Sequence, residues 1–208
     1  METRLIPVGI SNRHVHVSQA DLETLFGPGY QLTELRPLSQ PGQFAAQEVV
    51  TLVGSKGQIA KVRILGPARP VTQVEISQTD AIKLGVSAPV RDSGDLEGSP
   101  GLTLVGPHGA VTLEQGVILA CRHIHMTPAD AEHFGVQDKQ RVDIKTFGER
   151  AVVFEDVLVR VSATYALELH LDTDEANAAL LRNGEYVRLR MREMVTGVSR
   201  HGSITLVG

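Results

Sequence analysis

The sequence predicts a mainly β protein of two similar small β-barrel domains, which are related by internal duplication and carry short helices. A six-residue phrase at positions 13–18 returns at positions 122–127, and the stretches after the two copies also match. Between these landmarks lie short runs of β-branched residues separated by turns. Many short strands with few helices favour small barrels over a doubly wound sheet.

The repeated phrase places two histidines two positions apart, His14 and His16 in the first copy and His123 and His125 in the second. In an extended strand, side chains at i and i+2 point to the same face. Each phrase therefore directs two imidazoles to one place. Two such pairs in one chain indicate a metal site.

A short helix is expected after each phrase. Ser18 and Thr127 are good N-caps, and acidic residues in the next turn suit the helix dipole. Gly27 and Gly135 then end the two helices.

A second pair of matching strands supplies a third candidate ligand in each half. The stretch 73–81 aligns with the stretch 167–176, which places Glu75 opposite His170, each just before a second capped helix. The six candidate metal ligands are His14, His16 and Glu75 in one half and His123, His125 and His170 in the other.

These ligand types also indicate the metal. Five imidazoles and one carboxylate suit Zn²⁺, and could also hold Co²⁺, Mn²⁺ or Fe²⁺. Six ligands are too many for one catalytic ion that keeps an open position. We therefore expect two ions, one per lobe or bridged across the lobe interface.

The remaining elements are mostly strands. They are expected at residues 48–53, 59–65, 140–145 and 157–161, and a hairpin is expected at 102–113. The basic, strand-like tail at 186–192 is expected to be either an edge strand or an oligomer contact. Linker composition at residues 92–101 predicts the boundary between a first lobe (1–95) and a second lobe (96–208).

Composition limits the function classes. The net charge of -4 gives no electrostatic support for a nucleic-acid partner. No apolar run reaches the length that spans a bilayer, so no membrane partner is expected. A single cysteine, Cys121, fits a reducing compartment, and we expect it to be a buried structural thiol. His108, His133 and His201 have no repeat partner and are expected at the surface.

Arg69 is a candidate anion-binding residue. It lies in a turn stiffened by Pro67 and Pro70, six positions before Glu75, so its guanidinium fork would be held ready for phosphate or carboxylate. The loop at residues 40–46 is similarly stiff and is expected to form a wall or lid.

Several motifs, taken together and in order, resemble the propanediol-utilisation phosphotransacylases, the phosphate propanoyltransferases. They are the Ser-Asn-Arg-His-Val-His phrase at 11–16, Gln-Pro-Gly-Gln at 40–43, Gly-Pro with Arg69, the strand at 73–77, the second histidine phrase at 122–126 and the stretch at 171–177. The resemblance covers residues 7 to 178.

The resemblance implies transfer of a short acyl group, acetyl or propanoyl, between coenzyme A and phosphate at a two-zinc site between two β-barrel domains. It makes the six candidate ligands zinc ligands, and Arg69 the catalytic phosphate binder. It also implies a coenzyme A site lined by Ile10, Ser11, Asn12, Lys56 and Asn177. No nucleotide-binding glycine motif occurs, so residue spacing alone does not point to coenzyme A. No Ser-His-Asp nucleophile elbow occurs either, which argues against an acyl-serine intermediate.

Other readings of the sequence stay open. A binuclear metal-dependent hydrolase, acting on a thioester or phosphoester, would use the same ligands to activate water, and a metal-binding module would show no turnover. Members of the family in bacterial microcompartments are expected to carry an amphipathic N-terminal extension, which residues 1–11 do not resemble. The chain is therefore expected to be a bacterial cytoplasmic member or a shortened chain, with shell association in doubt and the oligomeric state open, a homodimer included.

Overall fold

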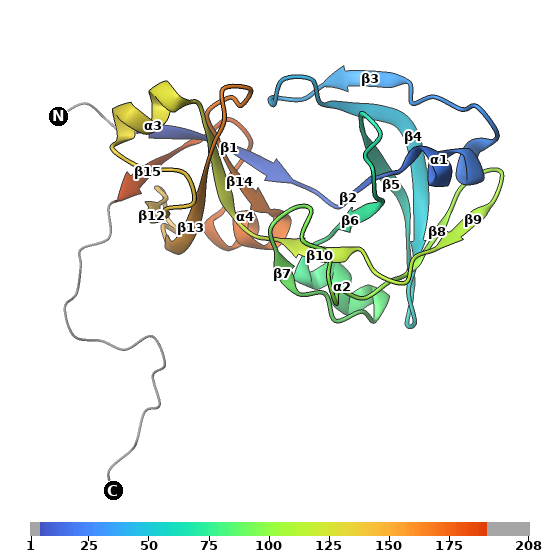
Figure 1. Ribbon diagram of the computed structural model, residues 1–208. Helices are drawn as coiled ribbons and strands as arrows, with labels where there is room; N and C mark the ends of the chain where they lie inside the picture. Colours follow the sequence, from blue (N-terminus) through green and yellow to red (C-terminus); the bar gives the residue numbers. More distant parts are fainter. Residues whose placement is uncertain (1–4, 191–208) are drawn as a thin grey trace, which may run out of the picture.

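The computed structural model describes residues 5–190, which form two β lobes joined by two crossings of the chain (Figure 1). One lobe is a closed barrel and the other is a curled nine-stranded sheet. The predicted mainly β class with short helices is confirmed.

We call the two parts the barrel lobe and the curled-sheet lobe. The barrel lobe contains strands β1 (Leu5–Ser11), β11 (His123–Met126), β12 (Arg141–Lys145), β13 (Val153–Val161), β14 (Glu168–Asp172) and β15 (Tyr186–Arg190), with helices α3 (Pro128–Phe134) and α4 (Thr173–Ala179). The curled-sheet lobe contains strands β2 (His14–His16), β3 (Glu34–Pro37), β4 (Phe44–Val53), β5 (Gln58–Gly66), β6 (Gln73–Glu75), β7 (Val90–Arg91), β8 (Thr103–Val105), β9 (Ala110–Thr112) and β10 (Val117–Ala120), with helices α1 (Gln19–Phe26) and α2 (Gln78–Leu84).

The barrel closes because its last strand pairs with its first. β15 runs antiparallel to β1, with Ile6 opposite Val187, and also pairs with β12. The tail strand, predicted as an edge strand or an oligomer contact, is therefore an internal strand of the barrel; residues 191–192 of that prediction lie outside the described part. Because the barrel closes, the backbone N–H and C=O groups of β15 form hydrogen bonds with a neighbouring strand on each side.

The two lobes exchange one strand each. β1 precedes the first histidine phrase but pairs in parallel with β14 of the barrel, with Gly9 opposite His170. β10 precedes the second phrase but pairs in parallel with β6 of the curled sheet, with Ile118 opposite Glu75. Gly9 and Ile118 each stand five positions before the first histidine of their phrase, so the exchange is reciprocal and in register.

This exchange corrects the predicted boundary at residues 92–101. Strands β8, β9 and β10 follow that linker, yet they stay in the curled sheet, and β1 belongs to the barrel. The chain changes lobe at residues 12–13 and again at 121–122, immediately before each histidine pair. Linker composition marks a loop, whereas sheet membership depends on long-range pairing that composition does not reveal.

The predicted helices and hairpin are confirmed. The Ser18 and Thr127 side chains accept hydrogen bonds from the backbone N–H groups of Asp21 and Asp130, as N-caps do. Ser77 and Asp172 cap α2 and α4 in the same way. In the hairpin, the N–H of Gly106 donates to the carbonyl of Gly109 between β8 and β9.

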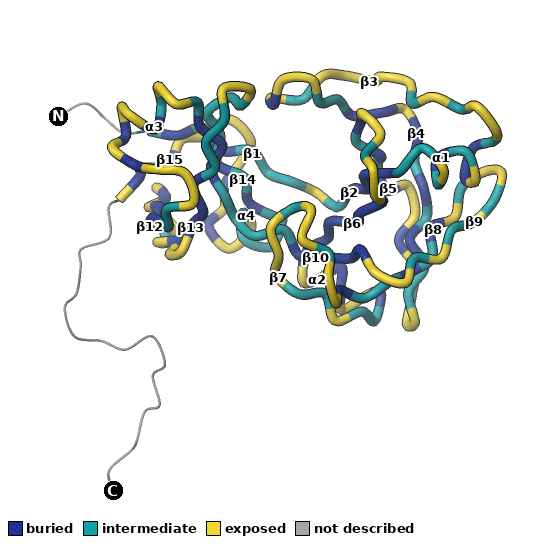
Figure 2. Tube along the Cα trace, viewed as in Figure 1, coloured by how far each residue is buried: buried dark blue, intermediate teal, exposed yellow. Residues whose placement is uncertain are grey.

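Each lobe has its own apolar core (Figure 2). The barrel core includes Ile6 of β1, Ile124 of β11 and Leu169 of β14, all fully buried. The core of the curled sheet includes Leu52 and Ile64, packed under α1 and α2. Within the described residues, no helix has the length and apolar character to cross a bilayer.

The exchange of β1 can be tested by truncating Ile6, which is 0% exposed. Ile6→Ala is expected to lower the free energy of unfolding by about 2 to 5 kcal/mol, because it empties space between β1 and the rest of the barrel. Ile82→Ala is a matched control, because Ile82 is 67% exposed on α2 and should change stability by less than about 0.5 kcal/mol. Urea denaturation followed by circular dichroism measures both, and equal midpoints for the two variants would show that β1 is not part of the barrel core.

Candidate metal centre and anion site

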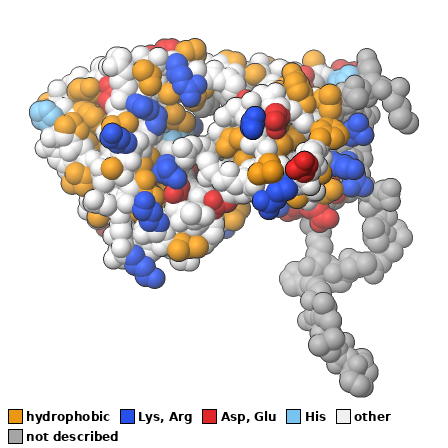
Figure 3. All heavy atoms as spheres, turned by 180° about the vertical axis from the view of Figure 1, so that it is seen from behind, with side chains coloured by type: hydrophobic (Ala, Val, Ile, Leu, Met, Phe, Trp, Pro, Cys, Tyr) orange, Lys and Arg blue, Asp and Glu red, His pale blue; other side chains and the backbone are white. Residues whose placement is uncertain are grey.

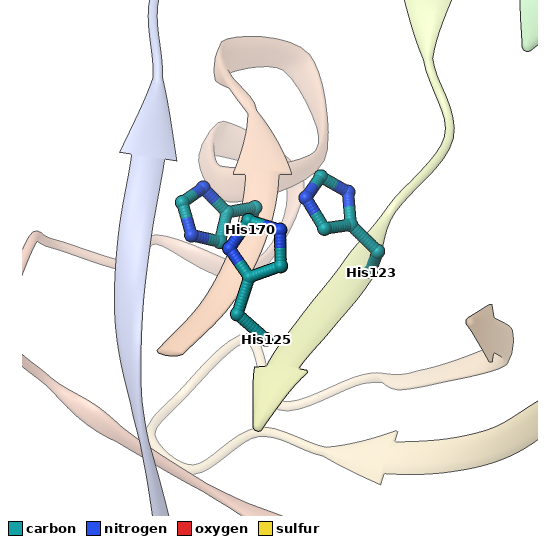
Figure 4. A group of neighbouring side chains, drawn as sticks. All are labelled: His123, His125 and His170. Atoms are coloured by element: carbon teal, nitrogen blue, oxygen red, sulfur yellow. The ribbon is translucent and has the colours of Figure 1, made fainter. Parts of the chain in front are cut away.

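Strand register brings each predicted ligand triad together. β2 runs antiparallel to β6 with His14 opposite Glu75, and β11 runs antiparallel to β14 with His123 opposite His170. In each triad, one ligand atom from every residue lies within 4.8 Å of the others. In the second triad, the rings from β11 and β14 converge on one point (Figure 4).

The first triad is held by hydrogen bonds around Glu75. Nε2 of His14 lies 3.5 Å from Glu75 Oε2, and Nε2 of His16 lies 3.9 Å from Oε1. The Gln73 amide and the Ser93 hydroxyl donate to Oε1 of the same carboxylate, at 2.6 and 3.0 Å. The carboxylate is therefore oriented by its neighbours before any ligand arrives.

The second triad is held mainly by ring contacts. The rings of His123 and His170 stack with their centroids 4.9 Å apart, and that of His125 meets both edge-on. Tyr165 stacks on the other side of His125 at 4.2 Å. Glu168, two positions before His170 on β14, places Oε2 3.0 Å from Nε2 of His170.

Burial and neighbouring charges keep three of the triad histidines, His16, His123 and His125, neutral. Burial, followed by the neighbouring charges of His14 and Arg69, lowers the pKa of His16 to about 3. Burial and the charge of His170 lower the pKa of His123 to about 4, and burial with the charge of His123 lowers that of His125 to about 2. These rings are therefore neutral at physiological pH, which is the form that binds metal.

Glu75 is held in its charged form. Burial raises the pKa of its carboxyl, but His14, His16 and the Ser93 hydrogen bond lower it by more, to about 2. A buried carboxylate and two imidazoles are donor types that zinc binds.

Unpaired ring nitrogens also fit a metal. Nδ1 of His16 and Nδ1 of His125 are buried and make no hydrogen bond within the described part of the chain. Buried polar atoms without a partner are uncommon and call for an explanation, and a bound ion supplies one. The two triads thus fit divalent cations in donor type, and each contains a buried ring nitrogen without a hydrogen-bond partner among the described residues.

Both triads open into one cavity of about 890 Å³ between the lobes. Its wall also carries the cations Arg13, Arg36, Lys61, Arg63, Arg69 and Arg160. Seen from behind, Lys and Arg side chains gather on the curled-sheet lobe beside the hollow between the lobes (Figure 3). The cavity is large enough for a small-molecule substrate and is electrostatically suited to an anion.

Arg69 is anchored beside the first triad. Its backbone N–H donates to the Val17 carbonyl at 2.8 Å, and its Nη1 donates to the Ser93 hydroxyl at 3.2 Å. Burial lowers the pKa of the guanidinium, the charge of Arg160 also lowers it, and Glu75 raises it. No carboxylate of the described residues lies within ion-pair distance of Arg69, so its remaining donors are free for a ligand anion.

The stiff loop after β3 extends toward the barrel lobe (Figure 1) and contacts it through Gln40. The Gln40 side chain donates to the Ala166 carbonyl at 3.0 Å and accepts from the Ala166 N–H at 3.2 Å. The Ser39 hydroxyl donates to Glu168. The loop, predicted as a wall or lid, forms one wall of the cavity and ties the two lobes together.

The coenzyme A residues implied by the resemblance fall into two groups. Ile10, Ser11 and Asn12 line the cavity at the first crossing. Lys56, in the turn between β4 and β5, and Asn177, exposed on α4, lie outside its lining. The structure thus brings together only the first three of these with the metal triads.

Sequence reasoning missed several lining residues. Ser93, Arg160 and Tyr165 lie in loops or far along the chain from the motifs, and no local pattern signals them. The position of Glu168 near the site can be inferred from the sequence, because it stands two positions before His170 and its side chain lies on the same face of the strand.

Two further expectations concern residues near the site. Cys121 is half-buried rather than fully buried; its thiol accepts a hydrogen bond from Arg141 at 3.3 Å, and its carbonyl accepts one from His123. His108 and His133 are exposed as expected, and His201 lies outside the described residues.

Comparisons with known proteins agree with this site. The sequence profile of the phosphate propanoyltransferase family matches residues 7–182. A phosphate propanoyltransferase of Thermotoga maritima is 61% identical over 183 residues, 88% of this chain and 87% of its own length. The phosphate propanoyltransferase of Salmonella typhimurium is 53% identical over 86% of this chain and 85% of its own length. That of Rhodopseudomonas palustris is 50% identical over 88% of this chain and 81% of its own length. The chain therefore belongs to the phosphate propanoyltransferase family and is an acyltransferase.

Proposed function

We propose that this chain transfers an acetyl or propanoyl group between coenzyme A and inorganic phosphate, with two zinc ions in its active site, one in each triad. The observation that carries the proposal is the convergence of two metal-binding triads and an arginine with free donors on one cavity. The relatives named phosphate propanoyltransferases support the substrate class.

The first ion would be held by His14, His16 and Glu75, and the second by His123, His125 and His170. Bound zinc supplies Lewis acidity that stabilises negative charge on a carbonyl oxygen or a thiolate. The first ligand set includes the Glu75 carboxylate and brings one negative charge to its ion, whereas the second set consists of three imidazoles and brings none.

Arg69 binds phosphate in this proposal. Its free guanidinium donors match two oxygens of a phosphate, and its anchored backbone fixes the direction of approach. Holding phosphate next to the thioester removes much of the entropic cost of bringing two substrates together.

The reaction we infer is direct. A phosphate oxygen attacks the acyl carbon, the carbon–sulfur bond breaks, and coenzyme A leaves as a thiolate that takes up a proton. Ser93 is a poor nucleophile here because its hydroxyl donates to Glu75, a carboxylate with a pKa of about 2 and little basicity. Ser11 lies 3.3 Å from His14 Nδ1, but that nitrogen already donates to the Asn12 carbonyl.

Coenzyme A would enter past residues 10–12, with its phosphates near the cations of the curled-sheet lobe, Arg36, Lys61 and Arg63. Lys56 and Asn177 are proposed to contact parts of the cofactor that extend beyond the cavity.

The first prediction concerns the reaction itself. Thiol release from acetyl- or propanoyl-coenzyme A should require phosphate, yield acyl phosphate, stop after chelation and return with added zinc. A thiol assay coupled to hydroxamate detection of acyl phosphate measures both products. Thiol release without phosphate would instead identify the chain as a metal-dependent hydrolase.

The second prediction concerns Arg69. Arg69→Ala should lower kcat/KM for phosphate by at least roughly 30-fold, because losing a charge-assisted clamp costs about 2 to 3 kcal/mol. Arg69→Lys should recover part of the loss. Arg150→Ala is the control, because Arg150 is exposed in the loop between β12 and β13 and does not line the cavity. An Arg69→Ala enzyme with wild-type phosphate kinetics would remove Arg69 from this role.

A further inference from the structure

We propose that Arg13 and Arg122 are positioning residues, which set the tautomer and ring direction of the first histidine in each triad. Neither arginine belongs to a triad. The proposal rests on the metal-binding triads of the proposed function, but the measurement that decides it uses metal-free protein.

The first observation is an ion pair that occurs twice. Nε of Arg13 lies 2.7 Å from Asp80 Oδ2, and Nη1 of Arg122 lies 2.8 Å from Glu175 Oε1. Each arginine directly precedes the first histidine of its phrase. Each acid is the third residue of the helix that follows the third ligand, in α2 and in α4.

The positions of the two acids match in detail. Asp80 stands five positions after Glu75, and Glu175 stands five positions after His170. The duplicated chain has therefore kept the same bridge between a ligand strand and a helix, although the acid differs in length. An incidental surface ion pair would not be expected at equivalent places in both halves.

The second observation is a ring contact that also occurs twice. Nδ1 of His14 lies 2.8 Å from the carbonyl oxygen of Asn12, and Nδ1 of His123 lies 2.8 Å from that of Cys121. Since a carbonyl oxygen only accepts, each Nδ1 carries the hydrogen and each Nε2 is left as the free donor atom.

The arginine connects these two observations. It is the residue between the accepting carbonyl and the histidine, so pinning its side chain to a helix fixes the peptide segment that holds the ring. Only the backbone carbonyl is used, which explains why the repeat tolerates Asn12 in one half and Cys121 in the other. This is the pattern of an outer partner that orients a metal-binding histidine.

The two halves differ in how strongly the arginine is held. Within residues 5–190, the Arg13 side chain is held by Asp80, which is 3% exposed. Arg122 also donates from Nε to the Glu155 carbonyl at 3.0 Å and lies 5.5 Å above the Phe154 ring. Loss of the acid should therefore affect His14 more than His123.

Nitrogen-15 NMR of histidine-labelled, metal-free protein at mildly alkaline pH tests the proposal. In the wild type, His14 and His123 should both show the Nδ1-protonated tautomer. Arg13→Met should give a mixture of tautomers at His14 alone, and Arg122→Met at His123 alone. Asp80→Asn, which keeps the shape of the acid, should disturb His14 more than Glu175→Gln disturbs His123.

Arg150→Met is the matched control, because Arg150 is exposed in the loop between β12 and β13 and does not line the cavity. Arg13→Lys retains the charge and covers the case in which Arg13→Met does not fold. The proposal would be overturned if neither arginine variant changed the tautomer of His14 or His123. It would also be overturned if each arginine variant changed His14 and His123 equally.

A zinc measurement separates this proposal from the proposed function. Competition with a chromophoric chelator should show that Arg13→Met lowers the zinc affinity of one site by about tenfold or more and leaves that of the other site unchanged. Arg122→Met should lower the affinity of the other site instead. Glu75→Ala and His170→Ala, each of which breaks one triad, assign the sites. A wild-type chain that binds no zinc would refute the two-zinc centre, and the tautomers would still decide the role of the arginines.

Discussion

The site depends on the register of two antiparallel strand pairs. In each pair, the first histidine of a phrase stands directly opposite a third ligand, Glu75 for His14 and His170 for His123. Side chains on one strand alternate between faces, so a shift of one residue in either pair would turn a ligand away from its partners. The apolar residues between the ligands, Val15 and Ile124, are fully buried and resist such a shift.

The reciprocal strand exchange explains why two separate triads share one cavity. The chain passes between lobes immediately before each histidine phrase, so both phrases begin at the lobe interface. The exchanged strands β1 and β10 pair with the strands that carry the third ligands, which ties each triad to both halves of the sequence. The contact of Gln40 with Ala166 adds a third connection across the same interface.

The electrostatic arrangement favours cations in the triads and anions beside them. The histidines with lowered pKa values are neutral, Glu75 is charged, and Arg69 lacks a carboxylate partner among the described residues. The arginines nearest the triads in sequence, Arg13 and Arg122, are by contrast paired with acids on α2 and α4. Arginine thus serves two purposes around the triads, which are distinguished by whether an acid lies within reach.

The sequence by itself determined the local elements and the set of candidate ligands. Alternating histidines, N-caps and the internal repeat are short-range patterns, and they predicted the ligand strands, the four capped helices and the six residues that the structure brings together. Only the tertiary structure decided which strands pair. It placed β1 in the barrel, β10 in the curled sheet and β15 inside the barrel rather than at an edge, and it added Ser93, Arg160 and Tyr165 to the cavity. The reason is physical: an element forms from neighbouring residues, whereas strand partners and cavity walls join residues from about forty to well over a hundred positions apart, which no local pattern encodes.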